Sequence, residues 1–227
     1  PSATDSIWRH KRRSVVEASR DISPTPQTDA RAKPARPEVG IASDALDDAS
    51  ATDARVGEVF LSADELRSRV EELGVEISRD YENRALLLVS LLKASFVFLT
   101  DLSRAIPIEH QIDFVELTGY NGADTGGHSR VRLLKDCAIP VTGLDVLLVE
   151  DVVDTGLTLN YLRKLLELRE PASLRIAALL DRPYRRLVED LPVDYVGFTV
   201  PDEFFVGYGF DVDGRWRNLP DLRLAKV

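Results

Sequence analysis

Apolar residues recur with two different periods from Val56 onward, and their alternation predicts strands and helices in turn. Mainly apolar runs of strand length cover residues 86–92, 146–149 and 174–180, and residues 112–117 also have the pattern of a strand. Between them, for example within residues 96–106, apolar residues three and four positions apart predict amphipathic helices. Buried strands that alternate with such helices predict an α/β fold with a mainly parallel, twisted sheet flanked by helices.

Local signals add detail to this pattern. Ser62, with Glu65 three positions later, matches a capping box and predicts that a helix begins there. Three further short strands are expected at residues 131–134, 193–200 and 204–208. We therefore expect one folded domain over residues 56–227.

Residues 1–55 differ from this domain in composition. They are rich in Ser, Thr, Ala, Asp and Pro and lack a sustained apolar period, which predicts a disordered N-terminal extension. The basic patch at residues 8–13 leaves two interpretations open, a solvated tail or part of an organelle transit peptide. Nearby acidic residues favour the tail, because transit peptides contain few acids.

Charge and composition narrow the classes of function. Residues 1–36 carry +4 within a net charge of −9, so the remainder carries −13, which argues against nucleic acid as the main partner. One cysteine, Cys137, fits a reducing compartment, and no apolar run is long enough to span a membrane. The expectation is a cytoplasmic protein with small-molecule ligands.

The richest motif lies in residues 146–159. An apolar strand leads into Glu150 and Asp151, and Asp154 follows in a turn before a helical pattern. Open α/β sheets bind ligands in such loops, at the carboxyl ends of their strands. Adjacent carboxylates repel phosphate, but they accept hydrogen bonds from sugar hydroxyls or hold a divalent cation.

The same loop predicts a phosphate site at the start of the following helix. Backbone N–H groups at a helix N-terminus point outward and attract anions, and threonine hydroxyls add donors. The expected groups belong to Thr155, Gly156, Leu157 and Thr158. None of the 13 glycines fits an NTPase phosphate loop or a G-x-G-x-x-G dinucleotide turn.

This segment, VEDVVDTGLT, resembles the phosphoribosyl-pyrophosphate (PRPP) signature of the type I phosphoribosyltransferases. With Asp154 before Thr-Gly, it is similar to the 6-oxopurine branch, the hypoxanthine-guanine phosphoribosyltransferases. The resemblance implies a sheet with a small hood, and purine salvage from PRPP and a 6-oxopurine base. It also implies that Asp154 is the catalytic residue near purine N7. Magnesium (Mg²⁺) would be held by Glu150, Asp151 and Asp211.

Two further segments are similar to the family's pyrophosphate site and lid. In LLKASFVFLTDLSRAI, Lys93-Ala94 stands where the family has a Lys-Gly peptide, often in cis, whose N–H groups meet pyrophosphate. By the same resemblance Arg217 contacts pyrophosphate. The glycine-rich segment 119–129 looks like the family's mobile lid.

The remaining matches concern the purine. The resemblance implies that Arg182, in place of the usual lysine, meets the exocyclic O6, that Phe204 stacks on the ring, and that the Phe205 backbone reads the base edge. It also implies a homodimer or homotetramer. Two alternatives stay open: a xanthine-preferring phosphoribosyltransferase, and a PRPP-binding regulatory protein of the same fold without turnover.

Overall fold

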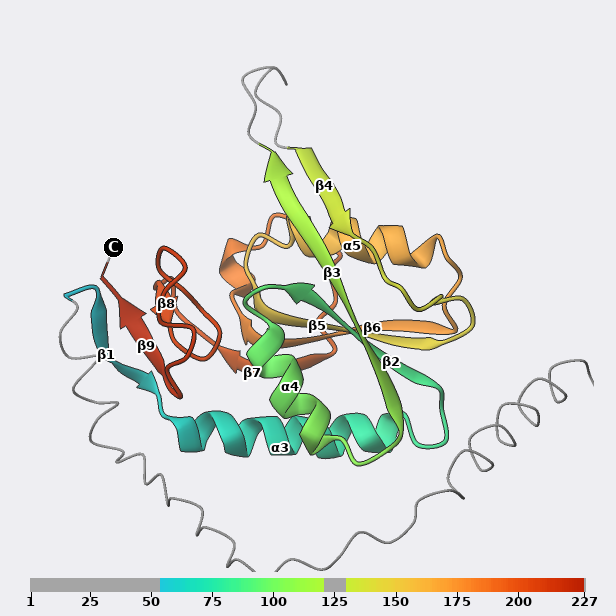
Figure 1. Ribbon diagram of the computed structural model, residues 1–227, viewed down its shortest axis with the longest axis horizontal. Helices are drawn as coiled ribbons and strands as arrows, with labels where there is room; N and C mark the ends of the chain where they lie inside the picture. Colours follow the sequence, from blue (N-terminus) through green and yellow to red (C-terminus); the bar gives the residue numbers. More distant parts are fainter. Residues whose placement is uncertain (1–53, 121–129, 227) are drawn as a thin grey trace, which may run out of the picture. The chain divides into compact units, whose positions relative to one another are not determined.

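The computed structural model describes residues 54–120 and 130–226 of the chain (Figure 1). The predictions of a disordered extension over residues 1–55 and of a lid at residues 119–129 therefore fall almost wholly outside the described residues. In chain order the elements are β1 (Val56–Leu61), α3 (Ala63–Asp80), β2 (Leu86–Leu92), α4 (Phe96–Ala105), β3 (His110–Tyr120), β4 (Arg130–Lys135), β5 (Asp145–Val153), α5 (Leu157–Glu167), β6 (Ser173–Asp181), the 3₁₀ turn η2 (Pro183–Arg185), β7 (Tyr195–Thr199), β8 (Phe205–Val206) and β9 (Leu222–Ala225).

A six-stranded sheet in the order β4-β3-β2-β5-β6-β7 forms the centre of the fold. Its strands are parallel except at the β3–β4 pair, which is antiparallel. The prediction of a mainly parallel α/β sheet is thus confirmed. In β2 and β5 the first five residues are all buried, as expected for central strands covered on both faces, and most of the residues after them are partly buried.

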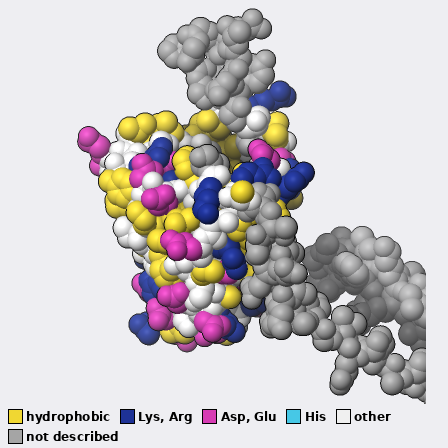
Figure 2. Space-filling model, turned by 90° about the vertical axis from the view of Figure 1, so that its left-hand side faces the viewer, with side chains coloured by type: hydrophobic (Ala, Val, Ile, Leu, Met, Phe, Trp, Pro, Cys, Tyr) yellow, Lys and Arg dark blue, Asp and Glu magenta, His cyan; other side chains and the backbone are white. Residues whose placement is uncertain are grey.

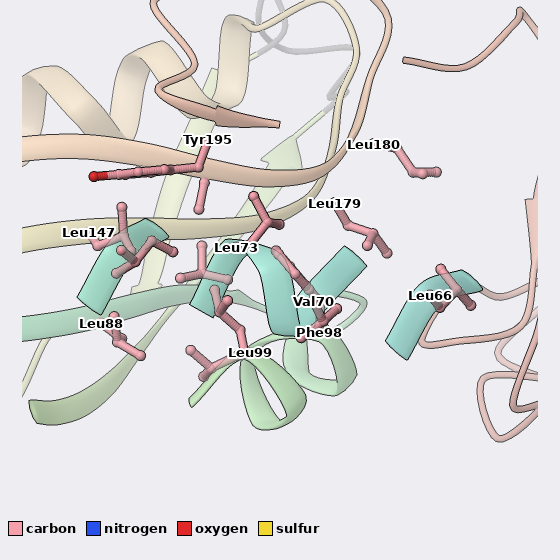
Figure 3. Close-up of a cluster of buried hydrophobic side chains, with 14 of the residues drawn as sticks. Leu66, Val70, Leu73, Leu88, Phe98, Leu99, Leu147, Leu179, Leu180 and Tyr195 are labelled. Atoms are coloured by element: carbon pink, nitrogen blue, oxygen red, sulfur yellow. The ribbon is translucent and has the colours of Figure 1, made fainter. Parts of the chain in front are cut away.

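Helices cover the two faces of this sheet differently. On one face α3 and α4 pack against the sheet and against each other, and Figure 3 shows this cluster around Leu73, Phe98 and Leu147. On the other face α5 packs through its buried leucines against the alternate side chains of the same strands. Successive strand residues point to opposite faces, so each central strand contributes to both clusters.

Helix α3 begins where its sequence predicts. The Ser62 hydroxyl accepts a hydrogen bond from the Glu65 N–H at 3.3 Å, and the Glu65 carboxylate accepts one from the Ser62 N–H at 2.8 Å. This capping box satisfies two backbone donors that the helix itself leaves free. None of the described helices is long and apolar enough to cross a membrane.

A second sheet, β1-β9-β8, forms the hood and joins the first described strand to the last. Its pairs are antiparallel, and Phe60 and Phe205 pack between it and the main core with ring centroids 4.9 Å apart. Figure 2 shows this side of the molecule, where acidic and basic side chains are interspersed with hydrophobic ones. The hood carries the long loop between β8 and β9, which reaches back to the main sheet.

The carboxyl ends of β2, β5, β6 and β7 lie at one edge of the sheet, because these four strands are parallel. The segments that follow them therefore come together there. They are the Lys93 loop, the Asp154 loop, the η2 turn and the Pro201–Phe204 loop. This edge holds most of the residues that the sequence singles out.

Candidate active site

The acidic pair lies inside β5 rather than after it. The sequence interpretation ended the strand at the acids, but pairing with β6 continues through Glu150↔Ala178 and Val152↔Leu180 to the end of β5 at Val153. Residues Asp154–Gly156 alone then form the loop before α5. The ladder to β6 thus holds the backbone of both carboxylates rigidly at the edge of the sheet.

Burial and mutual repulsion disfavour the charged forms of this pair. The pKa of Glu150 lies well above its usual range because the carboxyl group is desolvated and feels the charge of Asp151. Desolvation likewise raises the pKa of Asp151 to about 6; the charge of Arg217 opposes this shift and that of Asp211 adds to it. Two carboxylates that are costly to ionise together provide a favourable place for a cation.

Asp211 and Arg217 reach Asp151 from the hood loop. Their side chains form an ion pair, with Nη2 and Oδ1 2.5 Å apart, and Asp211 also accepts a hydrogen bond from the Gly214 N–H at 2.7 Å. Among the described residues no group of three or more His, Cys, Asp and Glu side chains is arranged to hold a metal ion. The donor set therefore fits a Mg²⁺ ion that takes one or two carboxylates and completes its shell with substrate phosphates and water.

Gly156 opens the end of α5 at which the sequence predicts a phosphate site. It is the N-cap residue at φ +78° and has no side chain to cap the helix; of the described first-turn N–H groups, that of Leu157 makes a long contact of 3.5 Å with Thr155 Oγ1. A Cβ at Gly156 would stand 2.8 Å from a methyl carbon of Leu191, so the close packing there requires glycine. A hollow of about 250 Å³ lies at this end and is lined by Glu150, Thr155 and Thr158 among others.

The loop after β2 approaches the hood loop. Its cis peptide is Leu92–Lys93, one bond before the Lys93-Ala94 peptide to which the sequence interpretation pointed. Lys93 is exposed, and the Ala94 carbonyl oxygen touches the backbone of Gly209. Arg217 donates from Nη1 to the Gly209 carbonyl at 2.6 Å. Two of the three residues predicted to bind pyrophosphate, Ala94 and Arg217, thus meet at one glycine, and Lys93 directly precedes Ala94.

A buried serine pair supports this loop and was missed from sequence. Ser90 and Ser95 are fully buried, with their hydroxyl oxygens 2.8 Å apart. Ser90 also donates to the Val149 carbonyl at 3.1 Å, directly before Glu150. The pair connects the end of β2, the start of α4 and the acidic part of β5. Serines at positions 90 and 95 between apolar residues were the available signal.

Two adjacent phenylalanines take different places. Phe204 is 62% exposed, whereas Phe205 is 6% exposed and packs in the core. The Arg182 guanidinium lies over the Phe205 ring, 5.4 Å from its centroid, and donates from Nη2 to the Glu203 carbonyl. Arg182 is buried, and its Nε has no hydrogen-bond partner among the described residues. A buried donor without a partner costs free energy, and this Nε has no surface open to a ligand in the structure as it stands.

Asp154 is held by a residue to which sequence reasoning gave no role. Its Oδ1 lies 2.7 Å from Nε of Arg185, and Nη1 of Arg185 lies 2.6 Å from Oδ1 of Asp202. The available signal for Arg185 was its position in the short turn after β6, three residues beyond Arg182.

A family model for the phosphoribosyl transferase domain matches residues 62–213. The chain belongs to the phosphoribosyltransferase family. Hypoxanthine phosphoribosyltransferase of Salmonella typhimurium is 45% identical over 165 residues, which are 72% of this chain and 92% of that protein. The match places the chain in the hypoxanthine branch of the phosphoribosyltransferases, as the sequence resemblance predicted.

Solved structures agree with this assignment. A hypoxanthine-guanine phosphoribosyltransferase from Bacillus anthracis has a TM-score of 0.70 and 40% identity, covering 76% of this chain and 99% of that one. A Trypanosoma cruzi hypoxanthine phosphoribosyl transferase, studied for the role of its C-terminal region in oligomeric state and enzymatic activity, has a TM-score of 0.70 and 34% identity, with coverage of 77% and 93%. The predicted phosphoribosyltransferase fold is confirmed.

Proposed function

We propose that the chain is a purine-salvage enzyme that transfers the 5-phosphoribosyl group of PRPP to hypoxanthine or guanine, giving IMP or GMP and pyrophosphate. One observation carries the proposal. The end of β5 combines an acidic pair, a third carboxylate and an uncapped helix N-terminus within nine residues. The acidic pair suits a cation and the ribose hydroxyls, the third carboxylate suits a purine nitrogen, and the helix N-terminus suits a phosphate.

Binding of PRPP uses the two ends of this segment. The N–H groups and hydroxyls of residues 155–158 receive the 5′-phosphate, because an uncapped helix start attracts anions. Glu150 and Asp151 accept hydrogen bonds from the ribose hydroxyls, and one or two carboxylates of the set Glu150, Asp151 and Asp211 hold Mg²⁺ together with the substrate phosphates. When bound, Mg²⁺ supplies positive charge that stabilises the departing pyrophosphate.

The leaving group meets donors from two loops. Arg217 and backbone N–H groups of Lys93 and Ala94 contact pyrophosphate as the C–O bond at the anomeric carbon breaks. These contacts grow stronger as negative charge develops on the leaving oxygen, so they favour the transition state over bound PRPP. Positive charge that builds up on the sugar is offset by Glu150 and Asp151.

The base side uses the third carboxylate. Asp154 accepts the hydrogen bond or proton at purine N7 while the new bond from purine nitrogen to the sugar forms. Phe204 stacks on the purine, the backbone of Phe205 reads the base edge, and Arg182 donates to O6. The exposed ring of Phe204 and the position of the Arg182 guanidinium next to the loop that carries it support these roles.

The decisive experiment measures nucleotide formation from PRPP and Mg²⁺ with hypoxanthine, guanine and xanthine tested separately. We expect turnover with hypoxanthine or guanine and much less with xanthine. A preference for xanthine would assign a different substrate. Binding of PRPP without turnover of any base would instead indicate a regulatory protein of the same fold.

We also propose that the enzyme works in the cytoplasm as a homodimer or homotetramer. The single cysteine supports a reducing compartment, and the Trypanosoma cruzi relative, whose oligomeric state was studied, supports assembly. Light scattering after size-exclusion chromatography distinguishes the oligomers, and a monomer at micromolar concentration would contradict this part.

A further inference from the structure

Three neighbouring residues of the η2 turn hold the loop that precedes Phe204. Arg182 donates to the Glu203 carbonyl, the Tyr184 hydroxyl donates to the Val200 carbonyl at 2.8 Å, and Arg185 pairs with the Asp202 carboxylate at 2.6 Å. Of these, Arg185 alone also reaches the β5–α5 loop, through its ion pair with Asp154. It therefore joins two walls of the candidate purine site.

The contact with Arg185 distinguishes the two carboxylate oxygens of Asp154. Oδ1 is buried and lies 2.7 Å from Nε of Arg185, an ion-pair contact without hydrogen-bond geometry, yet 35% of the side chain as a whole is exposed. The accessible oxygen is therefore Oδ2. A guanidinium that fixes one oxygen leaves the other oxygen in a defined direction, which is what a residue that contacts a substrate nitrogen needs.

Arg185 stays positively charged, and the side chain of its neighbour Arg186 binds other partners. Its hydrogen bond to Asp202, together with the charges of Asp154 and Asp202, raises the pKa of Arg185 above the usual value for arginine. The adjacent Arg186 pairs with Asp181 and donates to the Leu191 carbonyl at 2.9 Å. Arg186 is thus engaged beneath Gly156 and does not duplicate the bridge.

We propose that Arg185 is a positioning residue for phosphoribosyl transfer: it fixes Asp154 by one oxygen and ties it to the loop that carries Phe204. The free oxygen of Asp154 then meets the purine held against Phe204. This inference rests on the proposed function, because it assigns Asp154 to the purine. It adds a residue that acts on the base step through Asp154 and leaves the PRPP subsites untouched.

The test compares R185Q, R185K and Y184F with the wild-type enzyme. In R185Q we expect kcat to fall by about 10- to 100-fold, since small misplacement of a reacting group costs this much, with KM for PRPP unchanged within about twofold. R185K keeps the charge but cannot serve two carboxylates in fork geometry, so it should recover part of kcat. Y184F removes one tether of the same loop without touching Asp154 and should keep kcat.

A crystal structure of R185Q gives a readout that does not depend on turnover. We expect the Asp154 carboxylate to turn and the Pro201–Phe204 loop to shift, both relative to wild type.

An unmoved Asp154, or wild-type kcat in R185Q, overturns the positioning role and leaves the proposed function intact. Loss of kcat in Y184F as large as in R185Q overturns it as well, because loop tethering alone would then explain the effect. A wild-type protein without turnover contradicts the proposed function, and the crystal structures still decide whether Arg185 places Asp154.

Discussion

Gly209 and Ala94 touch backbone to backbone, and a Cβ placed on Gly209 would overlap the Ala94 carbonyl oxygen. The contact joins the loop after β2 to the loop between β8 and β9. Gly209 has φ +99°, a conformation that residues with a side chain rarely adopt. Because Arg217 also donates to the Gly209 carbonyl, this glycine sets the spacing between the two proposed parts of the pyrophosphate site.

We therefore predict that Gly209→Ala damages both stability and PRPP use. The backbone strain and the overlap together should lower the free energy of unfolding by about 2–4 kcal/mol. The displaced loop should raise KM for PRPP about tenfold or more, with a smaller effect on KM for the base. Urea unfolding and initial rates at varied PRPP concentration measure the two effects.

Gly214→Ala is the matched control for this prediction. Gly214 has a similar positive φ of +78°, but a Cβ there would meet nothing within 4 Å. It should lose only about 1 kcal/mol of stability and keep KM for PRPP. Equal effects in the two variants would mean that backbone strain, and not the contact with Ala94, is responsible.

The two adjacent phenylalanines give a second prediction. Phe204→Ala removes an exposed ring, so we expect KM for the purine base to rise about tenfold, corresponding to loss of one stacking contact, with stability nearly unchanged. Phe205→Ala empties a core position beside Phe60 and should lower the free energy of unfolding by about 3–5 kcal/mol. Thermal unfolding and base titration of both variants check this. A stable F205A or a base KM unchanged in F204A would contradict the assignment.

Local patterns in the sequence were sufficient to locate the main elements. The strand predicted at residues 86–92 coincides with β2, and the capping box at Ser62 and Glu65 marks the start of α3. Both follow from neighbours in the chain: a continuous apolar run is buried on two faces, and a serine with a glutamate three residues later satisfies the first helical turn. The PRPP-like segment was recognised for the same reason, since its residues are consecutive.

Contacts between distant segments were not readable from the sequence. Arg185 meets Asp154 only because β6 lies beside β5, and Ser90 meets Ser95 only because a tight loop folds α4 back onto β2. The end of β5 was placed too early, because the ladder to β6 outweighs the polarity of the acidic pair. Strands β1 and β9 were missed, since each is stabilised by the other across the 160 residues that separate them, 62–221.

Asp154 provides the third prediction. Asp154→Asn removes the acceptor for the proton at purine N7, so kcat should fall by about 100-fold or more. PRPP contacts other residues of the loop, so its dissociation constant should change by less than about twofold in calorimetric titration. Asp64→Asn, an exposed position on α3, is the control for loss of one negative charge. Wild-type kcat in D154N would remove Asp154 from the chemistry.

The acidic pair gives a fourth prediction, which concerns pH and stability without metal. Desolvation by burial raises the pKa of Asp151 from its usual value near 4 to about 6, so the folded protein binds this proton more tightly than the unfolded chain does. Stability should consequently fall as pH rises from about 4 to about 6, and the full cost should persist at higher pH. The ionised pair is thus expected to make the metal-free protein less stable at neutral pH.

Asp151→Asn should therefore raise Tm in EDTA at pH 8, by a gain in the free energy of unfolding of about 1–3 kcal/mol, and change it little at pH 4. The same variant should bind Mg²⁺ with PRPP more weakly, because a carboxylate ligand is lost.

Asp136→Asn is the control, and its effect on stability should have the opposite sign. The hydrogen bond from Arg169 lowers the pKa of Asp136 below its usual value near 4, so its neutralisation should destabilise the protein by a nearly constant amount from pH 8 down to about pH 4. Thermal unfolding from pH 4 to 8 measures both variants, and a lower Tm of D151N at pH 8 would show that the acidic pair is not strained in the folded protein.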